Sequence, residues 1–293
     1  MRAADTAMYH AKERGRNNFQ FFTAELNRVA QQRLLMANRL RHALASEEFA
    51  LYYQPQVDME SGAIRSAEAL LRWQRPGQRA VSCGAFISIA EETGLIAPIG
   101  EWALREACRQ LRQWHDAGHR DLRIAVNLSP RQFYQPAIEE TVCDILQEAG
   151  LPPQALELEI TESILLQRSE DNIATLRHLS EMGIQLSLDD FGTGYSSLAY
   201  LQRFPVHALK IDRTFINGIG RNPSDTALVA AIIAMAQGLQ LQVLAEGVET
   251  AEQIDFLLAH GCVLAQGYYY SQAVTADAFA DLLRGQARRS TNA

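Results

Sequence analysis

From residue 48 onward, short apolar runs typical of strands alternate with longer helical patterns, and this alternation limits the possible folds more than any other feature of the chain. Eight runs are predicted as strands: Phe49–Val57, Ile64–Trp73, Leu122–Leu128, Leu156–Thr161, Gln185–Leu188, Ala208–Ile211, Gln242–Ala245 and Val263–Ala265. Helices are predicted after most of them: Ile99–Trp114, Ala137–Ala149, Asn172–Met182, Ser197–Phe204, Thr226–Leu239, Ala251–His260 and Ala276–Leu283. Such alternation is typical of crossover units and a largely parallel sheet. Eight strands over about 220 residues fit a (β/α)8 barrel, and an open doubly wound sheet is the alternative.

The first two predicted strands are an exception to this rhythm, because only the segment Asp58 to Ala63 separates them. Ser61-Gly62 supplies turn residues in this connection. A connection this short joins antiparallel strands, whereas parallel strands need a long crossover. The sequence therefore predicts a TIM-like (β/α)8 barrel, of the α/β class, whose first strand is antiparallel.

The chain divides into four segments by pattern. Residues 1–21 predict a short helix and one strand, which are too small to bury a core, so we interpret them as the C-terminal end of an upstream domain. A helix is predicted from Ala24 to Ala45, and residues 22–46 are interpreted as a connecting helix. Residues 47–288 form the predicted barrel and residues 289–293 a tail.

Composition and charge exclude several classes of protein. Residues AVILMFWYC make up 47% of the 293 residues and DEKR 21%, which is typical of a globular chain. The net charge of −7 argues against binding a nucleic-acid polymer, which needs a basic face. The longest apolar run, Ala227–Ala236, is half as long as a membrane span, which needs about 20 residues. The four cysteines lack zinc-finger spacing. We therefore expect a reduced, cytoplasmic chain that makes no membrane contact.

Polar side chains recur where the predicted strands end, which is where barrel enzymes place their chemistry. In strand order they are Glu68, Asn127, Glu159 with Glu162, Asp189 with Asp190, Lys210 with Asp212, Glu246 with Glu249, and Gln266. Carboxylates and an amide, without histidine or cysteine, are ligands that hard cations such as Mg²⁺ or Mn²⁺ prefer. The adjacent pair Asp189-Asp190 can hold two ions close together, as phosphodiester hydrolysis by two metal ions requires.

Each of these residues also has an ordinary structural explanation. A single acidic residue at a strand end usually caps the next helix or lies on the surface. Glu162 fits the entry into a helix, and Glu249 fits a helix cap. The tyrosine run 268–270 fits packing better than a stacking platform. Coincidence explains the set poorly when seven successive strands each deliver such a residue to one mouth, so we predict a metal site there.

Glu68-Ala69-Leu70 followed by Leu71-Arg72-Trp73 resembles the signature of the EAL-domain phosphodiesterases, which hydrolyse the bacterial messenger cyclic di-GMP. The rest of the family pattern is similar and in order: Gln54-Pro55, Asn127-Leu128-Ser129, Glu159 to Glu162, Asp189 to Leu198, Leu209 to Asp212, Glu246 to Glu249 and Gln266-Gly267-Tyr268. The resemblance covers residues 30–285 and implies a TIM-like barrel with an antiparallel first strand. Residues 4–19 separately resemble the end of a GGDEF (diguanylate cyclase) domain, which implies a parent protein with GGDEF upstream of EAL.

The resemblance implies a role for each of the matching residues. The implied metal ligands are Glu68, Asn127, Glu159, Asp189, Asp190 and Glu246, with Asp189 bridging two ions and Asp190 holding the second. Lys210 is expected to contact the attacking water or a metal-bound oxygen, and with Asp190 and Glu246 it makes up the implied catalytic set. The residues expected to position the substrate are Gln54, Leu70, Arg72, Asp212, Glu249 and Gln266. Glu162 is expected to anchor the loop Phe191–Ser197, which in the family often couples to a dimer interface.

The implied reaction is hydrolysis of cyclic di-GMP to linear pGpG by in-line attack of a metal-bound hydroxide. Two divalent cations, Mg²⁺ or Mn²⁺, would activate the water and stabilise charge on the leaving 3′ oxygen. Ca²⁺ is expected to inhibit, and a homodimer is expected. One alternative is a receptor module that binds cyclic di-GMP without cleaving it. The other is an unrelated Mg²⁺ barrel enzyme that forms an enolate, for which only Lys210 could serve as the base.

Overall fold

The computed structural model describes residues 24–74, 83–166, 170–192 and 203–290. The chain forms two compact units, one of residues 1–50 and 72–96 and the other of residues 51–71 and 97–293. The predicted upstream remnant, residues 1–21, lies outside the described residues. The predicted tail lies outside them too, except for its first two residues, which belong to the last helix.

In the first unit, helix α2 (Ala24–Ala45) has the predicted bounds and pairs with helix α3 (Cys83–Thr93), which was not predicted. Leu40 and Ala43 of α2 are fully buried. The rings of Phe49, Trp73 and Phe86 form a cluster with centroids 5.7 to 6.1 Å apart. Such aromatic contacts dominate a small core, because each ring buries a large apolar area.

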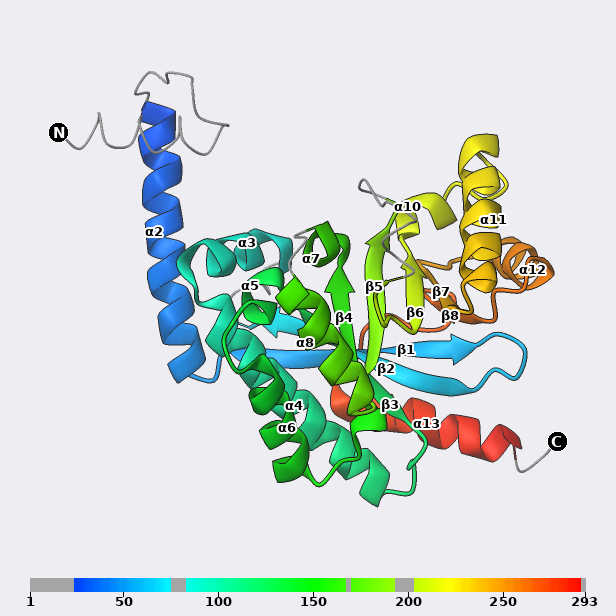
Figure 1. Ribbon diagram of the computed structural model, residues 1–293, viewed down its shortest axis with the longest axis horizontal. Coiled ribbons are helices and arrows are strands. Elements are labelled where there is room, and N and C mark those ends of the chain that lie inside the picture. The colour runs from blue at the N-terminus through cyan, green and yellow to red at the C-terminus, as the bar shows by residue number, and fades with distance from the viewer. Residues whose placement is uncertain (1–23, 75–82, 167–169, 193–202, 291–293) are drawn as a thin grey trace. The chain divides into compact units, whose positions relative to one another are not determined.

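The second unit contains a closed barrel in which the strands neighbour one another in chain order (Figure 1). The strands, which include residues at their ends that belong to the first unit, are β1 (Phe49–Asp58), β2 (Ile64–Trp73), β3 (Arg123–Leu128), β4 (Leu156–Thr161), β5 (Gln185–Phe191), β6 (Ala208–Ile211), β7 (Gln242–Glu246) and β8 (Leu264–Gln266). Strands β2 to β8 pair in parallel. The predicted barrel is confirmed, and the open doubly wound sheet is wrong.

Strand β1 runs antiparallel to its neighbour β8, with Val57 opposite Ala265, so the predicted direction of the first strand is confirmed. The short connection to β2 explains this direction. The backbone N–H of Asp58 donates to the carbonyl of Ala63 at 2.8 Å, and Gly62 adopts a left-handed φ of 72° that the turn requires. A reversed β1 still closes the barrel because its free edge pairs with β8.

Helices follow most strands of this unit: α4 (Ile96–Asp116), α5 (Pro130–Phe133), α6 (Ile138–Ala149), α7 (Glu162–Leu166), α8 (Glu170–Glu181), α10 (Arg213–Ile216), α11 (Pro223–Gly238), α12 (Ala251–Ala259) and α13 (Ala276–Ser290), with a 3₁₀ turn, η1 (Pro153–Ala155). The predicted long helices are confirmed with boundaries shifted by up to three residues, and by seven at the end of α13, which reaches Ser290 where Leu283 was predicted. The exception is the helix predicted over Ser197–Phe204, which lies outside the described residues apart from Arg203 and Phe204.

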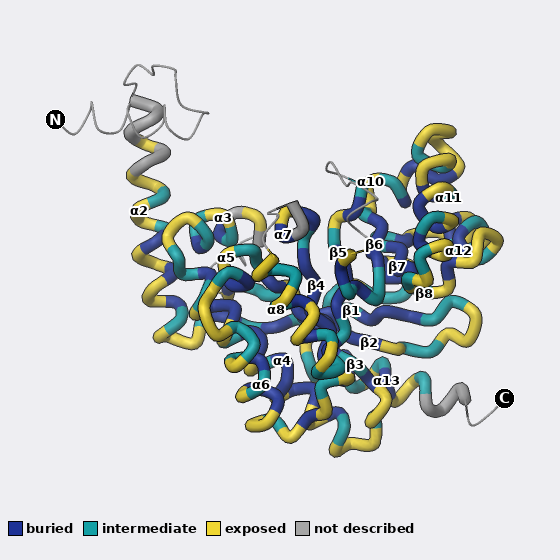
Figure 2. Tube along the Cα trace, viewed as in Figure 1, coloured by how far each residue is buried: buried dark blue, intermediate teal, exposed yellow. Residues whose placement is uncertain are grey.

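Side-chain caps explain where several of these helices begin. Thr250 caps α12 through a capping box with Gln253, so Glu249 is not the cap of that helix. Ser129 and Gln132 form the same arrangement at α5. Strand β4 is buried along most of its length (Figure 2). Because side chains alternate along a strand, Ile124 and Ile160 face the helices, whereas Glu159, which pairs with Lys210, faces the barrel interior. Polar side chains that face inward from different strands therefore lie near one another inside the barrel.

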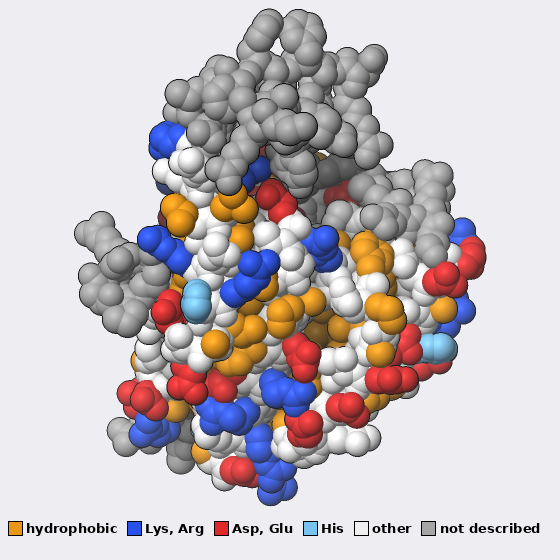
Figure 3. Space-filling view, turned by 90° about the vertical axis from the view of Figure 1, so that its left-hand side faces the viewer, with side chains coloured by type: hydrophobic (Ala, Val, Ile, Leu, Met, Phe, Trp, Pro, Cys, Tyr) orange, Lys and Arg blue, Asp and Glu red, His pale blue; other side chains and the backbone are white. Residues whose placement is uncertain are grey.

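Basic and acidic side chains are interspersed on the face shown in Figure 3. The same mixing occurs along α4, where Arg109 pairs with Glu106 at 2.7 Å and Arg112 pairs with Asp116 at 2.8 Å. Exposed pairs of this kind contribute little stability.

No helix among the described residues is both long and apolar enough to cross a membrane.

Gly267, directly after β8, provides a test of barrel closure. A Cβ atom at this position would overlap the backbone N and O atoms of Val248, and Val248 N–H donates to the carbonyl of Gln266 at 3.0 Å. We expect Gly267→Ala to lower the free energy of unfolding by about 1–3 kcal/mol through overpacking. Gly285→Ala is the matched control, because a Cβ there meets open space within α13 and should stabilise by about 0.5–1 kcal/mol. Urea titration measures both, and a Gly267→Ala protein as stable as the wild type would contradict this close approach.

Candidate active site

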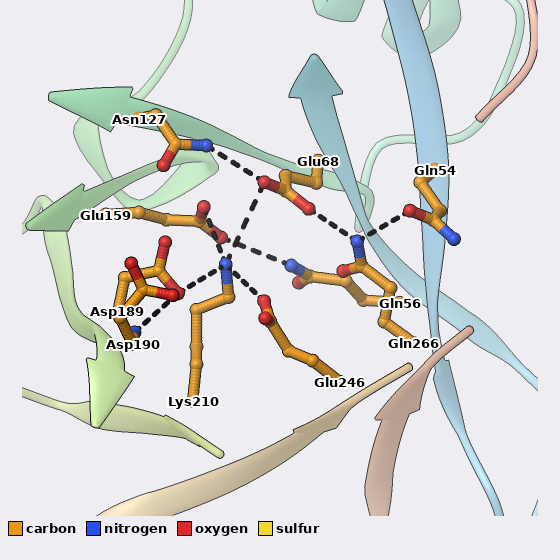
Figure 4. Close-up of polar contacts among 10 residues, drawn as sticks. All are labelled: Gln54, Gln56, Glu68, Asn127, Glu159, Asp189, Asp190, Lys210, Glu246 and Gln266. Atoms are coloured by element: carbon orange, nitrogen blue, oxygen red, sulfur yellow. Dashed lines mark hydrogen bonds and ion pairs between the residues drawn. The ribbon is translucent and has the colours of Figure 1, made fainter. Parts of the chain in front are cut away.

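The ammonium group of Lys210, delivered by β6, lies at the centre of the barrel mouth (Figure 4). Its Nζ atom is 2.7 Å from Glu246 Oε1, 2.8 Å from Glu159 Oε2, 3.2 Å from Asp189 Oδ1 and 3.8 Å from Glu68 Oε1. Lys210 is 1% exposed. Four strands, β2, β4, β5 and β7, thus bring one carboxylate each to a single buried cation.

Neutral amides also hold both oxygens of the Glu68 carboxylate. Asn127, from β3, donates to Glu68 Oε1 at 2.9 Å, and Gln266, from β8, donates to Glu68 Oε2. The same Gln266 amide donates to Gln54 Oε1 at 3.0 Å, and Gln54 Nε2 donates to the carbonyl of Ser271 at 3.0 Å. The predicted residues of β1, β2, β3 and β8 therefore form one hydrogen-bonded chain.

Gln56 also belongs to this site, although sequence reasoning did not select it. Its Nε2 atom donates to Glu159 Oε1 at 3.4 Å, and the side chain is buried. The signal was available, because residues two apart on a strand share a face and Gln54 was already in the predicted set.

Asp190 has an unusual backbone conformation for a strand residue. Its φ of 55° lies in the left-handed region, and the pairing of β5 with β6 shifts register between Leu188 and Phe191. Its backbone N–H donates to Asp189 Oδ1 at 3.0 Å. The local kink places two adjacent carboxylates at the mouth, where regular alternation would send one of them to the outside of the barrel.

Crowding and burial shift the pKa values of these groups. Burial and the neighbouring Glu68 charge raise the pKa of Glu159 well above its ordinary value. Burial and the charges of Asp189 and Glu68, partly offset by Lys210, raise the pKa of Glu246 to about 7. Burial alone would lower the pKa of Lys210, but the surrounding carboxylates raise it well above its ordinary value. Lys210 therefore keeps its proton in this arrangement.

The pKa values of two further carboxylates, Asp190 and Glu68, shift in opposite directions. Burial and the adjacent Asp189 charge raise the pKa of Asp190. Burial opposes ionisation of Glu68, yet the Lys210 charge and the Gln266 and Asn127 hydrogen bonds outweigh it and lower the pKa of Glu68. The site thus favours the ionised form of Glu68 and disfavours the ionised forms of Glu159, Asp190 and Glu246.

The donor set fits divalent cations. Fully ionised, the five carboxylates of the site would leave an excess of four negative charges beside Lys210, which two divalent cations would offset; they are Glu68, Glu159, Asp189, Asp190 and Glu246. Gln266 Oε1 is buried without a hydrogen-bond partner among the described residues, so an oxygen acceptor is left over at the site. Oxygen donors without nitrogen or sulfur suit Mg²⁺ or Mn²⁺.

The carboxylates are not yet spaced as a metal-binding group. Among the described residues, no three His, Cys, Asp or Glu side chains lie in an arrangement ready to hold an ion. Lys210 lies between the carboxylates instead. Cation binding therefore requires some of the Lys210 contacts to open.

The structure does not bring every predicted residue into this cluster. Asp212 caps α10, and its carboxylate accepts from Thr214 N at 2.8 Å. Glu249 is exposed, and its backbone N–H donates to Gln253 Oε1 at 2.7 Å. Leu70 is partly buried on β2, on the same face as Glu68 by alternation. Arg72 belongs to the first compact unit, so its placement toward the mouth stays a prediction.

Glu162 and the tyrosine run 268–270 are the remaining features for which the sequence made a prediction. Glu162 is the first residue of α7 and is buried, with neither carboxylate oxygen hydrogen-bonded within the described part of the chain. The loop that it is expected to anchor lies outside the described residues after Gly192. Packing, the favoured interpretation of the tyrosine run, is confirmed for Tyr270, which packs against the core, with the ring of Tyr269 edge-on to it at a centroid distance of 5.2 Å. It is wrong for Tyr268, which is 63% exposed.

Residues 37–273 match the protein family described as EAL domain, a stretch that contains every residue of the cluster. The chain belongs to the EAL-domain family. This EAL domain is 46% identical over 274 residues to the bifunctional diguanylate cyclase/cyclic di-GMP phosphodiesterase MucR of Pseudomonas aeruginosa, covering 94% of this chain and 40% of MucR. It is 43% identical over 279 residues to the cyclic di-GMP phosphodiesterase PdeR of Escherichia coli, covering 95% of this chain and 42% of PdeR. The chain thus spans well under half the length of these relatives.

Solved structures agree with this assignment. The EAL domain matches the MucR phosphodiesterase in its cyclic di-GMP complex with a TM-score of 0.81 at 44% identity, over 84% of this chain and 99% of that one. It matches the EAL domain of FimX from Xanthomonas citri, also in complex with cyclic di-GMP, with a TM-score of 0.76 at 27% identity, over 85% of this chain and 97% of that one. The TIM-like EAL barrel is therefore established for this chain.

Removing Asp189 should disturb cation binding. Ions that bind only the folded state stabilise it by about 2.7 kcal/mol at a hundredfold excess over Kd, so Mg²⁺ or Mn²⁺ should raise the melting temperature at about pH 8 by several degrees. We expect Asp189→Asn to abolish most of this rise while melting close to the wild type without metal. Asp121→Asn, an exposed change away from the mouth, is the matched control. A full wild-type rise in Asp189→Asn, measured by differential scanning fluorimetry, would remove Asp189 from the site.

The raised pKa of Glu246 predicts a pH dependence of the metal-free protein. A carboxyl with a pKa of about 7 when folded and 4.5 ordinarily binds more protons in the folded state between these values. Its contribution to stability is therefore present at low pH and lost as the pH rises through about 7. In EDTA, the melting temperature should fall between about pH 5 and pH 8, and Glu246→Gln should flatten that fall. Parallel pH profiles for the two proteins would contradict the assignment.

Proposed function

We propose that this EAL domain hydrolyses cyclic di-GMP to linear pGpG with the help of two divalent cations, Mg²⁺ or Mn²⁺. One observation carries the proposal: Glu68, Glu159, Asp189 and Glu246, from four strands, converge on Lys210 at the mouth of the barrel. Relatives named as cyclic di-GMP phosphodiesterases, among them MucR and PdeR, support the substrate class. The EAL signature and the ligand set are complete in this chain.

The proposed metal ligands are Glu68, Asn127, Glu159, Asp189, Asp190 and Glu246. When bound, two cations would lower the pKa of the attacking water and stabilise charge on the leaving 3′ oxygen. Lys210 contributes a fixed positive charge at the centre of the acids, where it can orient an attacking water or a phosphate oxygen. Because the surrounding carboxylates hold its proton, Lys210 is poorly suited to be the general base that an enolate-forming barrel enzyme would need.

Substrate positioning is assigned to side chains around the acids. Gln54 and Gln266 lie together at the mouth, where Gln266 Nε2 is 3.0 Å from Gln54 Oε1. Their amides can donate hydrogen bonds to a nucleotide and accept them from it. Arg72 is proposed to clamp a phosphate with its planar fork of donors. Leu70, Asp212 and Glu249 complete the proposed set. Glu162 is proposed to anchor the loop Phe191–Ser197.

The proposed wider context follows from the relatives. MucR combines diguanylate cyclase and phosphodiesterase activities in one protein, which supports an upstream GGDEF domain as the partner of this chain. We also propose a homodimer and a cytoplasmic location, with Ca²⁺ as an inhibitor that occupies the site without supporting turnover.

Incubation with cyclic di-GMP and Mg²⁺, followed by chromatography, tests the proposed activity. The wild type should convert the cyclic dinucleotide to pGpG, and EDTA should stop the conversion. Glu68→Gln should lose activity by at least about 100-fold, because it removes a charge that balances the cations. Glu60→Gln is the matched control, an exposed change that should leave activity intact. If cyclic di-GMP stays intact with a stoichiometric amount of the wild-type protein, the proposed hydrolase activity is contradicted. Binding of cyclic di-GMP without cleavage would identify the receptor alternative.

A further inference from the structure

Gln56 lies inside the barrel on β1, beside the most buried carboxylate of the mouth. Its side chain is 5% exposed, and Glu159 is 1% exposed. The Gln56 amide donates a long hydrogen bond of 3.4 Å to Glu159 Oε1, while Lys210 lies 2.8 Å from Glu159 Oε2 (Figure 4). One oxygen of this carboxylate therefore accepts from the Gln56 amide, and the other pairs with the Lys210 ammonium.

Among the residues that the structure describes, the other neighbours of Glu159 provide no second neutral donor. Ser187 is its register partner on β5, yet Ser187 Oγ is buried without a hydrogen-bond partner among the described residues. Glu157, two residues back on β4, adds negative charge that raises the pKa of Glu159 further. Among the described contacts, Gln56 is thus the uncharged group that orients the Glu159 carboxylate.

Side-chain alternation along β1 explains why two glutamines reach the site. Gln54 and Gln56 share the inner face of β1 because they are two residues apart. Gln54 accepts from Gln266, which also donates to Glu68, whereas Gln56 donates to Glu159 directly. Each glutamine of β1 thus acts on a different carboxylate.

A neutral donor suits a site that must attract cations. An amide satisfies a carboxylate oxygen without neutralising its charge, so the excess negative charge of the mouth is preserved. Donors that hold a metal ligand in place are worth about 10–100-fold in metal affinity. A cationic side chain at the same position would keep a donor but reduce the attraction for divalent ions.

We propose that Gln56 is a positioning residue that presets the Glu159 carboxylate for a divalent cation. This inference rests on one part of the proposed function, the binding of a divalent cation at Glu159. Gln56 does not contact the substrate in this role, so its loss should weaken cation binding while leaving the KM for cyclic di-GMP nearly unchanged.

The test compares Gln56→Met with the wild type by cation titration. Methionine has a similar length and no donor, so the Mn²⁺ concentration at half of the maximal melting-temperature rise should increase by about 10-fold. Gln110→Met is the matched control, because Gln110 is also buried (7% exposed) but lies on α4. Its Mn²⁺ midpoint should equal that of the wild type. At saturating Mn²⁺, the KM for cyclic di-GMP of Gln56→Met should stay within about twofold of the wild type, as expected for a group that acts on the cation.

Each result decides the inference. A Gln56→Met protein that melts normally without metal and keeps the wild-type Mn²⁺ midpoint would overturn it. If Gln56→Met does not fold, Gln56→Lys replaces it, and an unchanged Mn²⁺ midpoint in that variant would also overturn the inference. A wild type without any Mn²⁺ response would overturn both the cation site and this inference. A wild type that shows the response but does not cleave cyclic di-GMP would contradict the proposed function alone.

Discussion

One buried ammonium group makes the mouth of this barrel possible. Four carboxylates from four strands lie within 3.8 Å of Lys210 Nζ, in a position that is almost closed to water. Unpaired charges in such a place would be very costly, and like charges would force protons onto the acids. The Lys210 charge allows the acids to gather before any cation arrives. It does not neutralise them, so the mouth keeps an excess of negative charge.

Strand β1 contributes neutral side chains to this charged cluster. Two inward glutamines of β1, together with Gln266 of β8, provide neutral donors along one side of the mouth. Lys210 occupies the middle of the cluster. Amides fix the orientation of Glu68 and Glu159 without cancelling their charge, whereas further lysines would remove the attraction for cations. The barrel thus separates two tasks, since one ammonium relieves repulsion and several amides set geometry.

Much of the fold could be predicted because hydrophobic periodicity survives in long elements. The strand runs and the long helices agree with their predicted bounds to within three residues, apart from the end of α13, and the hairpin follows from the short connection after Asp58. Helices of four or five residues, such as α5 and α10, leave no periodic signal. Helix α3 was missed because no strand separates it from α4, so the strand–helix alternation does not indicate it.

The sequence by itself determined which side chains could meet, because parallel strands of a barrel end at one mouth and the polar residues at those ends are visible in the chain. Only the tertiary structure decided which atoms pair. Gln266 and Glu68 are 198 residues apart, and their hydrogen bond depends on how β8 closes against β1. The same closure brought in Gln56, while a local turn engaged Asp212 as a helix cap. The sequence specifies the side chain at each position. Which side chains touch depends on strand register and on how the barrel closes, and these are properties of the whole barrel.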